Sequence, residues 1–203
     1  RVTELAPVMD RVVSKARDMG VLIVHAPSDT IEHYKDHPAR RTATEAPKAT
    51  NLPEAFKSWR PWKDDVEKAA GYPIDHSDGG CDCVPPCKEG SPWTCQVGAI
   101  RIEDRDAISD SGVEVWNLLE SRGIENVFFC GVHTNMCVVA RPYGLRNLAR
   151  FGRDVALVRD LTDVAYDIRR PPEVSSWTAT DLVVEHIEKY ICPSVLSTDL
   201  TGQ

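Results

Sequence analysis

The chain has 203 residues, of which 42% are hydrophobic and 27% are charged, a balance typical of one ordinary globular domain. This composition excludes a disordered chain, a collagen and a disulfide-stabilised miniprotein. The 24 Lys and Arg residues are outnumbered by 31 Asp and Glu, which gives a net charge of −7. Because nucleic-acid binding requires a basic surface, we expect no nucleic-acid partner.

No run of 18 apolar residues occurs, so we also expect no membrane span. The chain begins at Arg1 and opens with no pattern typical of a secretion signal. The compartment therefore stays open, with the cytoplasm as the default.

Helices and strands alternate along most of the chain. Apolar residues recur every three or four positions over 3–19, which predicts a helix that ends at Gly20. An apolar strand is predicted at 21–25. In the second half, the pattern predicts strands at 97–102, 126–132 and 155–158, and helices at 112–122, 135–151 and 175–191. This alternation predicts an α/β fold, a single domain in which helices cover both faces of a mostly parallel sheet.

A long excursion interrupts the alternation at about 27–96. It is rich in proline and contains a Gly79-Gly80 pair, with short helices predicted at 53–59 and 63–70. Excursions of this length are usually lids or binding loops. Because a right-handed βαβ unit opens with a strand rather than a helix, we further expect a strand upstream of Arg1.

One cysteine lies where the strand at 126–132 leads into the next helix. Thr134 or Asn135 is predicted to be the N-cap, which places Cys137 in the first helical turn. The unpaired N–H groups and the helix dipole favour a thiolate there and can hold an oxyanion. We therefore regard Cys137 as a candidate nucleophile, with inert packing as the alternative.

The segment 131–138, Gly-Val-His-Thr-Asn-Met-Cys-Val, resembles the Gly-aliphatic-any-Thr-any-any-Cys-Val motif of the isochorismatase-like cysteine hydrolases. This superfamily includes nicotinamidases, isochorismatases and carbamoylsarcosine amidohydrolases. The resemblance covers roughly residues 1–26 and 97–192 and does not cover the excursion. It implies a three-layer α/β/α, Rossmann-like fold.

The resemblance also implies a reaction. Cys137 would attack a carbonyl carbon and form a thioester-type intermediate that water resolves, most commonly in the hydrolysis of an amide C–N bond in a small molecule. A cis peptide bond between Val132 and His133 is implied, with the backbone N–H groups of His133 and Cys137 forming the oxyanion hole. No organic cofactor is implied, and a homo-oligomer is expected because such proteins commonly assemble.

The sequence departs from the family pattern at two catalytic positions. The family aspartate would lie before Arg1, and the lysine expected at 102–105 is absent, since no lysine occurs between Lys88 and Lys189. Arg105 could supply the missing positive charge, although arginine cannot give up a proton. Glu103 or the neighbouring Asp104 could act as a base instead.

Two further residues near the cysteine are candidates. His133 could act as a base, or it could cap or pack. Arg141 lies one helical turn beyond Cys137 and could bind a substrate carboxylate, with a subunit contact or an exposed basic stripe as the alternative. The missing lysine also keeps open a non-catalytic, ligand-binding member of the same fold.

A third hypothesis is a thiol redox or zinc-binding protein. It depends on cysteines of the excursion, together with nearby acidic residues and a histidine: Cys81, Cys83, Cys87, Cys95, Asp75, His76 and Asp78. A disulfide and free loop thiols are the alternatives for these cysteines. A second set follows the strand at 21–25, namely His25, Asp29, His33 and His37; we expect no metal there. The aromatic residues Trp59, Trp62, Tyr72 and Trp93 either roof a pocket or form a small core of the excursion.

Overall fold

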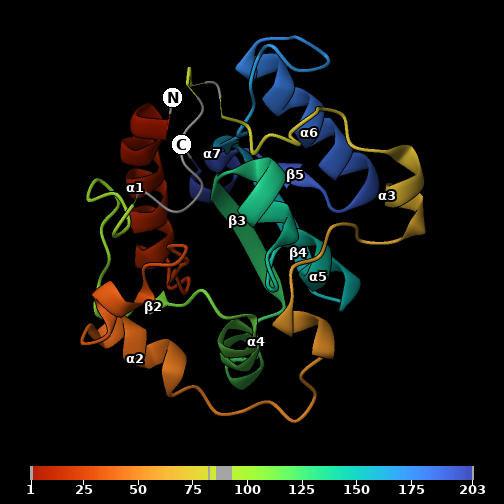
Figure 1. Cartoon of the computed structure of the whole chain (residues 1–203). Helices are drawn as coiled ribbons and strands as arrows, with labels where there is room; N and C mark the ends of the chain where they lie inside the picture. The colour runs from red at the N-terminus through yellow and green to blue at the C-terminus, as the bar shows by residue number, and fades with distance from the viewer. Residues whose placement is uncertain (1, 82, 86–92, 203) are drawn as a thin grey trace.

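The computed structural model describes residues 2–81, 83–85 and 93–202 and shows an α/β protein with parallel strands (Figure 1). Cys87 and its immediate neighbours lie outside the described residues. The elements of the first half are α1 (Val2–Asp18), β1 (Val24–His25), η1 (Ile31–Tyr34), α2 (Pro38–Thr44), η2 (Glu54–Lys57) and α3 (Asp65–Ala70). Those of the second half are β2 (Ala107–Ile108), α4 (Gly112–Ser121), β3 (Asn126–Val132), η3 (Thr134–Val138), α5 (Leu145–Arg150), β4 (Asp154–Asp163), α6 (Ser176–Tyr190), β5 (Ser194–Val195) and α7 (Ser197–Thr201).

The elements with the strongest periodicity form as predicted. The helices α1, α4 and α6 match their predicted ranges to within a few residues, and β3 matches the strand predicted at 126–132. The strand at 155–158 extends further, as β4, while the strand at 21–25 forms only over its last two residues. The two short helices predicted in the excursion are present as η2 and α3.

The strand predicted at 97–102 is wrong. This segment turns, with the N–H of Ile100 donating to the carbonyl of Val97 at 3.1 Å. The strand forms instead at β2, where Ala107 and Ile108 are fully buried. Two apolar residues between polar neighbours give no periodic signal, and only tertiary packing selects them as a strand.

The continuous helix predicted at 135–151 is also wrong. The chain forms the five-residue π-helix η3, breaks, and resumes as α5. Pro142 has no N–H to continue the helical ladder, and Gly144 becomes the N-cap of α5 with an extended backbone. A side chain on Gly144 would lie only 2.9 Å from the Val138 carbonyl oxygen, so the break packs closely against η3.

The strands form two parallel groups. β1 pairs with β2, and β3, β4 and β5 pair in that order. The register between β3 and β4 shifts between Phe129 and Gly131, just before the carboxyl end of β3. Such an irregularity changes the direction of the chain where the strand leads into η3.

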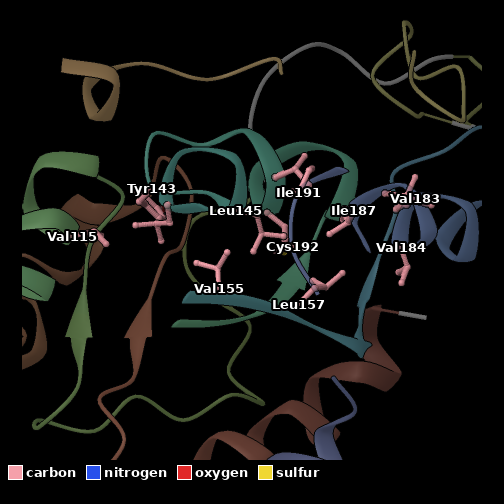
Figure 2. Packing of buried hydrophobic residues seen from close by; sticks show 14 of the residues in the cluster. Val115, Tyr143, Leu145, Val155, Leu157, Val183, Val184, Ile187, Ile191 and Cys192 are labelled. Atoms are coloured by element: carbon pink, nitrogen blue, oxygen red, sulfur yellow. The ribbon is translucent and has the colours of Figure 1, made fainter. Parts of the chain in front are cut away.

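Both faces of β4 are covered by helices. Val155 and Leu157 pack with Leu145 of α5 and Ile187 of α6 (Figure 2). Val158 points to the opposite face and packs with Met9 of α1. Because side chains alternate along a strand, successive residues of β4 supply both cores, and each fully buried aliphatic side chain contributes about 1.5–3 kcal/mol.

The excursion is tied to the rest of the molecule by a buried charge cluster. Glu67 of α3 is fully buried and accepts from Arg146 of α5 at 2.5 Å and from His186 of α6 at 3.1 Å. Arg146 also lies over the rings of Trp62 and Tyr72. These two aromatic residues thus belong to a small core around Arg146.

Candidate active site

The turn that carries Cys137 begins directly after β3. The peptide bond between Val132 and His133 is cis, as the resemblance implies, and η3 starts at Thr134. The predicted N-cap is wrong: His133 occupies that position and makes no side-chain capping bond. The Thr134 hydroxyl instead forms a hydrogen bond of 2.5 Å with the Thr162 hydroxyl. The side-chain amide of Asn135 donates to the carbonyl of Ala165.

Asn135 fixes this turn to two other parts of the chain. Its side chain donates to the carbonyl of Ala165 at 2.8 Å and accepts from the N–H of the same residue at 2.9 Å. The Asn135 Nδ2 also lies 3.2 Å from His76 Nδ1 of the excursion. The turn is therefore held by the main chain that follows β4 and by a side chain of the excursion.

Cys137 is half-buried and lies between two polar side chains. Its Sγ is 3.7 Å from Ser28 Oγ, which follows β1. The guanidinium of Arg141 also interacts with the Cys137 thiol. Since the loop after β1 and the turn after β3 meet at this sulfur, it lies at the carboxyl ends of parallel strands, where ligands bind in open α/β sheets.

Arg141 brings a buried positive charge to the cysteine. Its Nη1 donates to the Tyr143 hydroxyl at 3.0 Å, and its guanidinium lies over the ring of Trp59. Burial opposes the charge, but Tyr143 and Cys137 more than offset it, so the pKa of Arg141 is raised. Its buried Nε has no hydrogen-bond partner among the described residues and is free to donate to a bound group.

Tyr143 contacts Arg141 and is in turn influenced by Asp110. Burial raises the pKa of Tyr143 to about 12, an effect that the Arg141 cation opposes and the carboxylate of Asp110 reinforces. Tyr143 therefore keeps its proton throughout the neutral range. Asp110 lies just beyond the carboxyl end of β2.

Two tryptophans of the excursion lie beside the residues that contact Cys137. Trp93 donates from its indole N–H to the Ser28 carbonyl at 2.9 Å, and Trp59 stacks with Arg141. Their side chains are about half exposed, at 50% and 53%. Both rings thus keep about half of their surface in contact with solvent.

His133 places an imidazole next to this turn. Burial lowers the pKa of His133, and Asp163 only partly offsets this effect. The ring is therefore neutral near pH 7, and its buried Nδ1 has no partner among the described residues. A neutral imidazole can accept a proton.

Glu103 and Arg105 lie elsewhere, against the carboxyl end of α1. Arg105 pairs with Glu103 at 2.9 Å and with Asp18 at 3.3 Å, and Glu103 also contacts Arg17 at 3.5 Å. These residues precede β2, whereas Asp110 follows it. The structure does not bring Glu103 or Arg105 to Cys137.

The first set of possible metal ligands is engaged in other bonds. His25 contacts Asp106 at 3.0 Å and Gln96 at 3.1 Å, and burial lowers the pKa of His25. His37 accepts from the N–H of Ala39 and caps α2, while His33 packs its ring against that of Tyr34. The structure does not gather these histidines around one point.

In the second set, Asp75 and Asp78 both pair with Arg170, and His76 bonds Asn135. Within the described ranges, no group of three or more His, Cys, Asp or Glu side chains is placed to hold a metal ion. The prediction involving Cys87 lies outside those ranges.

Sequence reasoning missed Ser28, Asp110 and Tyr143. Ser28 lies three residues beyond β1 and Asp110 lies two residues beyond β2. A polar residue just beyond the end of a parallel strand was the signal that could have identified them. The short strand β2 was not predicted, so the signal from Asp110 could not be used.

Comparison with known proteins gives no match: no protein-family model, no curated protein and no solved structure is similar to this chain. Among the helices that the structure describes, none combines the length and apolar character needed to cross a bilayer.

Proposed function

We propose that the chain is a cysteine hydrolase with a three-layer, Rossmann-like fold of the isochorismatase type, acting on the C–N bond of a small amide. The observation that carries this proposal is the position of Cys137, whose sulfur lies beyond β3 between Ser28 and the Arg141 cation. A positive charge beside a thiol favours its ionised, nucleophilic form.

In the proposed reaction, the Cys137 sulfur attacks the amide carbonyl carbon. A C–S bond forms, the C–N bond breaks, and the amine leaves with a proton. Water then cleaves the thioester, releasing the carboxylic acid and restoring the cysteine. The backbone N–H groups of His133 and Cys137 are the proposed donors to the oxyanion.

Arg141 stabilises negative charge in this scheme but cannot move a proton. The neutral imidazole of His133, which begins the turn that carries Cys137, and the carboxylate of Asp110, which acts on Tyr143, are the proposed proton acceptors. Arg141 is also the proposed donor to a carboxylate of the substrate, through its unpaired Nε.

The test is ammonia release from a panel of small primary amides and N-carbamoyl amino acids. We expect turnover of at least one compound, its loss in Cys137→Ala, and unchanged turnover in Cys95→Ala, which removes an exposed thiol outside the site. Trapping an acyl group on Cys137, identified by peptide mass spectrometry, would establish the intermediate. Turnover that survives Cys137→Ala would overturn the proposal.

A ligand-binding protein without turnover is the second candidate. It is favoured by the sequence 102–105, which lacks the family lysine, and by the placement of Arg105 away from Cys137. Saturable binding of an amide with no product over hours, unaffected by alkylation of Cys137, would select this candidate.

A further inference from the structure

The turn that carries Cys137 is short. η3 has five residues, and the N–H groups of Met136 and Val138 both donate to the carbonyl of His133, at 3.1 and 3.3 Å. A single helical turn orders several residues for few main-chain bonds, so it gains little stability by itself. The position of η3 therefore depends on side-chain contacts with other parts of the protein.

Asn135 supplies such a contact, and its side chain has one defined orientation. It is 3% exposed and lies two residues before Cys137. The Asn135 Oδ1 accepts from the N–H of Ala165, and Nδ2 donates to the carbonyl of Ala165. Because an N–H can only donate and a carbonyl can only accept, these two bonds distinguish the oxygen of the amide from its nitrogen. One N–H of Nδ2 remains, and it faces His76.

The hydrogen bond from Asn135 defines the tautomer of His76. The two nitrogen atoms, Asn135 Nδ2 and His76 Nδ1, are 3.2 Å apart. Since an amide nitrogen only donates, His76 Nδ1 must accept, and the ring proton must lie on Nε2. Burial and Arg146 lower the pKa of His76, and Asp75 and Asp78 only partly offset this effect, so the ring is neutral near pH 7.

The segment of the excursion that carries this imidazole is fixed on both sides of it. Arg170 pairs with Asp75 at 3.0 Å and with Asp78 at 3.5 Å. A side chain on Gly80 would collide with the carbonyl of Ala165, so the main chain there packs closely against the residue that Asn135 binds. The imidazole is thus held at the turn by contacts that do not involve its own ring.

The ring of His76 also continues into the Glu67 cluster. Tyr72 stacks on His76, with the ring centroids 4.9 Å apart and the planes 18° apart. The guanidinium of Arg146, which binds Glu67, lies over the ring of Tyr72. The side chains that join α3, α5 and α6 therefore reach η3 through one imidazole.

We infer that His76 is a positioning residue for Cys137: as the Nε2–H tautomer, it accepts the hydrogen bond by which Asn135 holds η3 against the excursion. Protonation of Nδ1 would set a donor against a donor, and the Asn135 amide cannot rotate without losing both bonds to Ala165. Acid should therefore loosen the turn. Any effect on turnover rests on the proposed function, whereas the tautomer and the order of η3 do not.

The first test is the ¹⁵N NMR spectrum of the histidine rings at pH 7, with the His76 signals assigned by their loss in His76→Asn. We expect the proton of the His76 ring on Nε2 and a lone pair on Nδ1. A proton on Nδ1 would overturn the inference. This measurement uses the unaltered protein, so it remains decisive if a variant fails to fold.

The second test separates the acceptor from the ring. His76→Phe keeps a ring to stack on Tyr72 but removes the acceptor, whereas His76→Asn loses the ring and keeps an acceptor, Oδ1, at the place of Nδ1. We expect hydrogen exchange at the amides of Met136 and Val138 to be about three- to tenfold faster in His76→Phe and close to wild type in His76→Asn. His33→Phe, at an exposed ring, is the control and should leave this exchange unchanged. Wild-type exchange in His76→Phe, or equal acceleration in both His76 variants, would overturn the inference.

The pH profile tests the protonation state. The titratable and charged groups around the ring are Tyr72, Asp75, Asp78, Arg146 and Arg170. All of them remain in His76→Asn, so this variant separates the titration of His76 from theirs. Between pH 8 and 5, exchange at the η3 amides, corrected for the intrinsic rate at each pH, should accelerate in the wild type and not in His76→Asn. Parallel profiles would overturn the inference. None of these measurements needs a substrate, so the inference and the proposed hydrolase activity fail or succeed separately.

Discussion

Arg141 places a cation against the Cys137 thiol. Replacing it as Arg141→Gln removes the cation beside the sulfur, so we expect alkylation of Cys137 at pH 7 to slow by about tenfold, equivalent to about 1.4 kcal/mol. Site-specific alkylation rates measured by mass spectrometry test this. Arg150→Gln, which removes an exposed charge from α5, is the matched control.

An equal rate in Arg141→Gln and Arg150→Gln would show that the buried guanidinium does not act on the sulfur. A thermal melt of each variant separates that result from unfolding. Arg141→Lys keeps the charge but loses the planar set of donors, so it should retain more of the alkylation rate than Arg141→Gln.

Gly112 is a second position where the addition of one carbon atom should change the stability of the protein. A methyl group there would meet the Phe56 carbonyl oxygen and approach Pro142 Cβ to 2.6 Å. We expect Gly112→Ala to lower the free energy of unfolding by about 1–3 kcal/mol, because α4 and η2 must move apart. Gly98→Ala meets no atom within 4 Å and is the control. Equal denaturant midpoints for the two variants would contradict this packing.

At the scale of elements, the Glu67 cluster joins α3 to α5 and α6. Burial raises the pKa of Glu67, but His186, Arg146 and the Lys63 N–H outweigh it, so the pKa lies below its usual 4.5. A carboxylate with a depressed pKa contributes stability that is complete above the unfolded value and is lost as the pH falls through the folded value. We therefore expect the free energy of unfolding to decline below about pH 4.5.

Glu67→Gln should flatten this part of the pH profile, measured by urea unfolding at pH 7 to 3. It should also cost about 3–5 kcal/mol at pH 7, because Arg146 is left buried without its anion. Glu54→Gln, at an exposed pair with Lys57, should change little. A Glu67→Gln profile parallel to that of the wild type would exclude Glu67 as the titrating group.

The elements also show what sequence could and could not predict. α1, α6 and β3 were predictable because each carries a long periodic or apolar run. β2 was not, since Ala107 and Ile108 owe their burial to distant partners. Cys137 could be selected from its local turn, whereas Ser28 and Asp110 reach the site only through pairing between distant segments. Arg141 was selected by helical spacing, and its N–H does donate to the Cys137 carbonyl one turn back, just before the helix breaks.

At the scale of the whole molecule, the excursion is part of the folded body. Phe56 is fully buried against Trp116, Glu67 binds two helices, and His76 bonds the turn that carries Cys137. The excursion is thus fixed by packing at these three anchors, and we expect insertions between the anchors to be better tolerated than substitutions at them.

Among the described residues, no strand pairs with the edge of β3 that lies opposite β4, and this has a consequence for how the protein behaves at high concentration. An uncovered row of main-chain donors and acceptors beside an exposed Phe128 is a template for intermolecular pairing, and a lysine on such a strand discourages it. We expect light scattering by residues 2–203 to rise steeply with concentration, and Phe128→Lys to suppress that rise. Scattering that is unchanged by Phe128→Lys would assign the self-association to another surface.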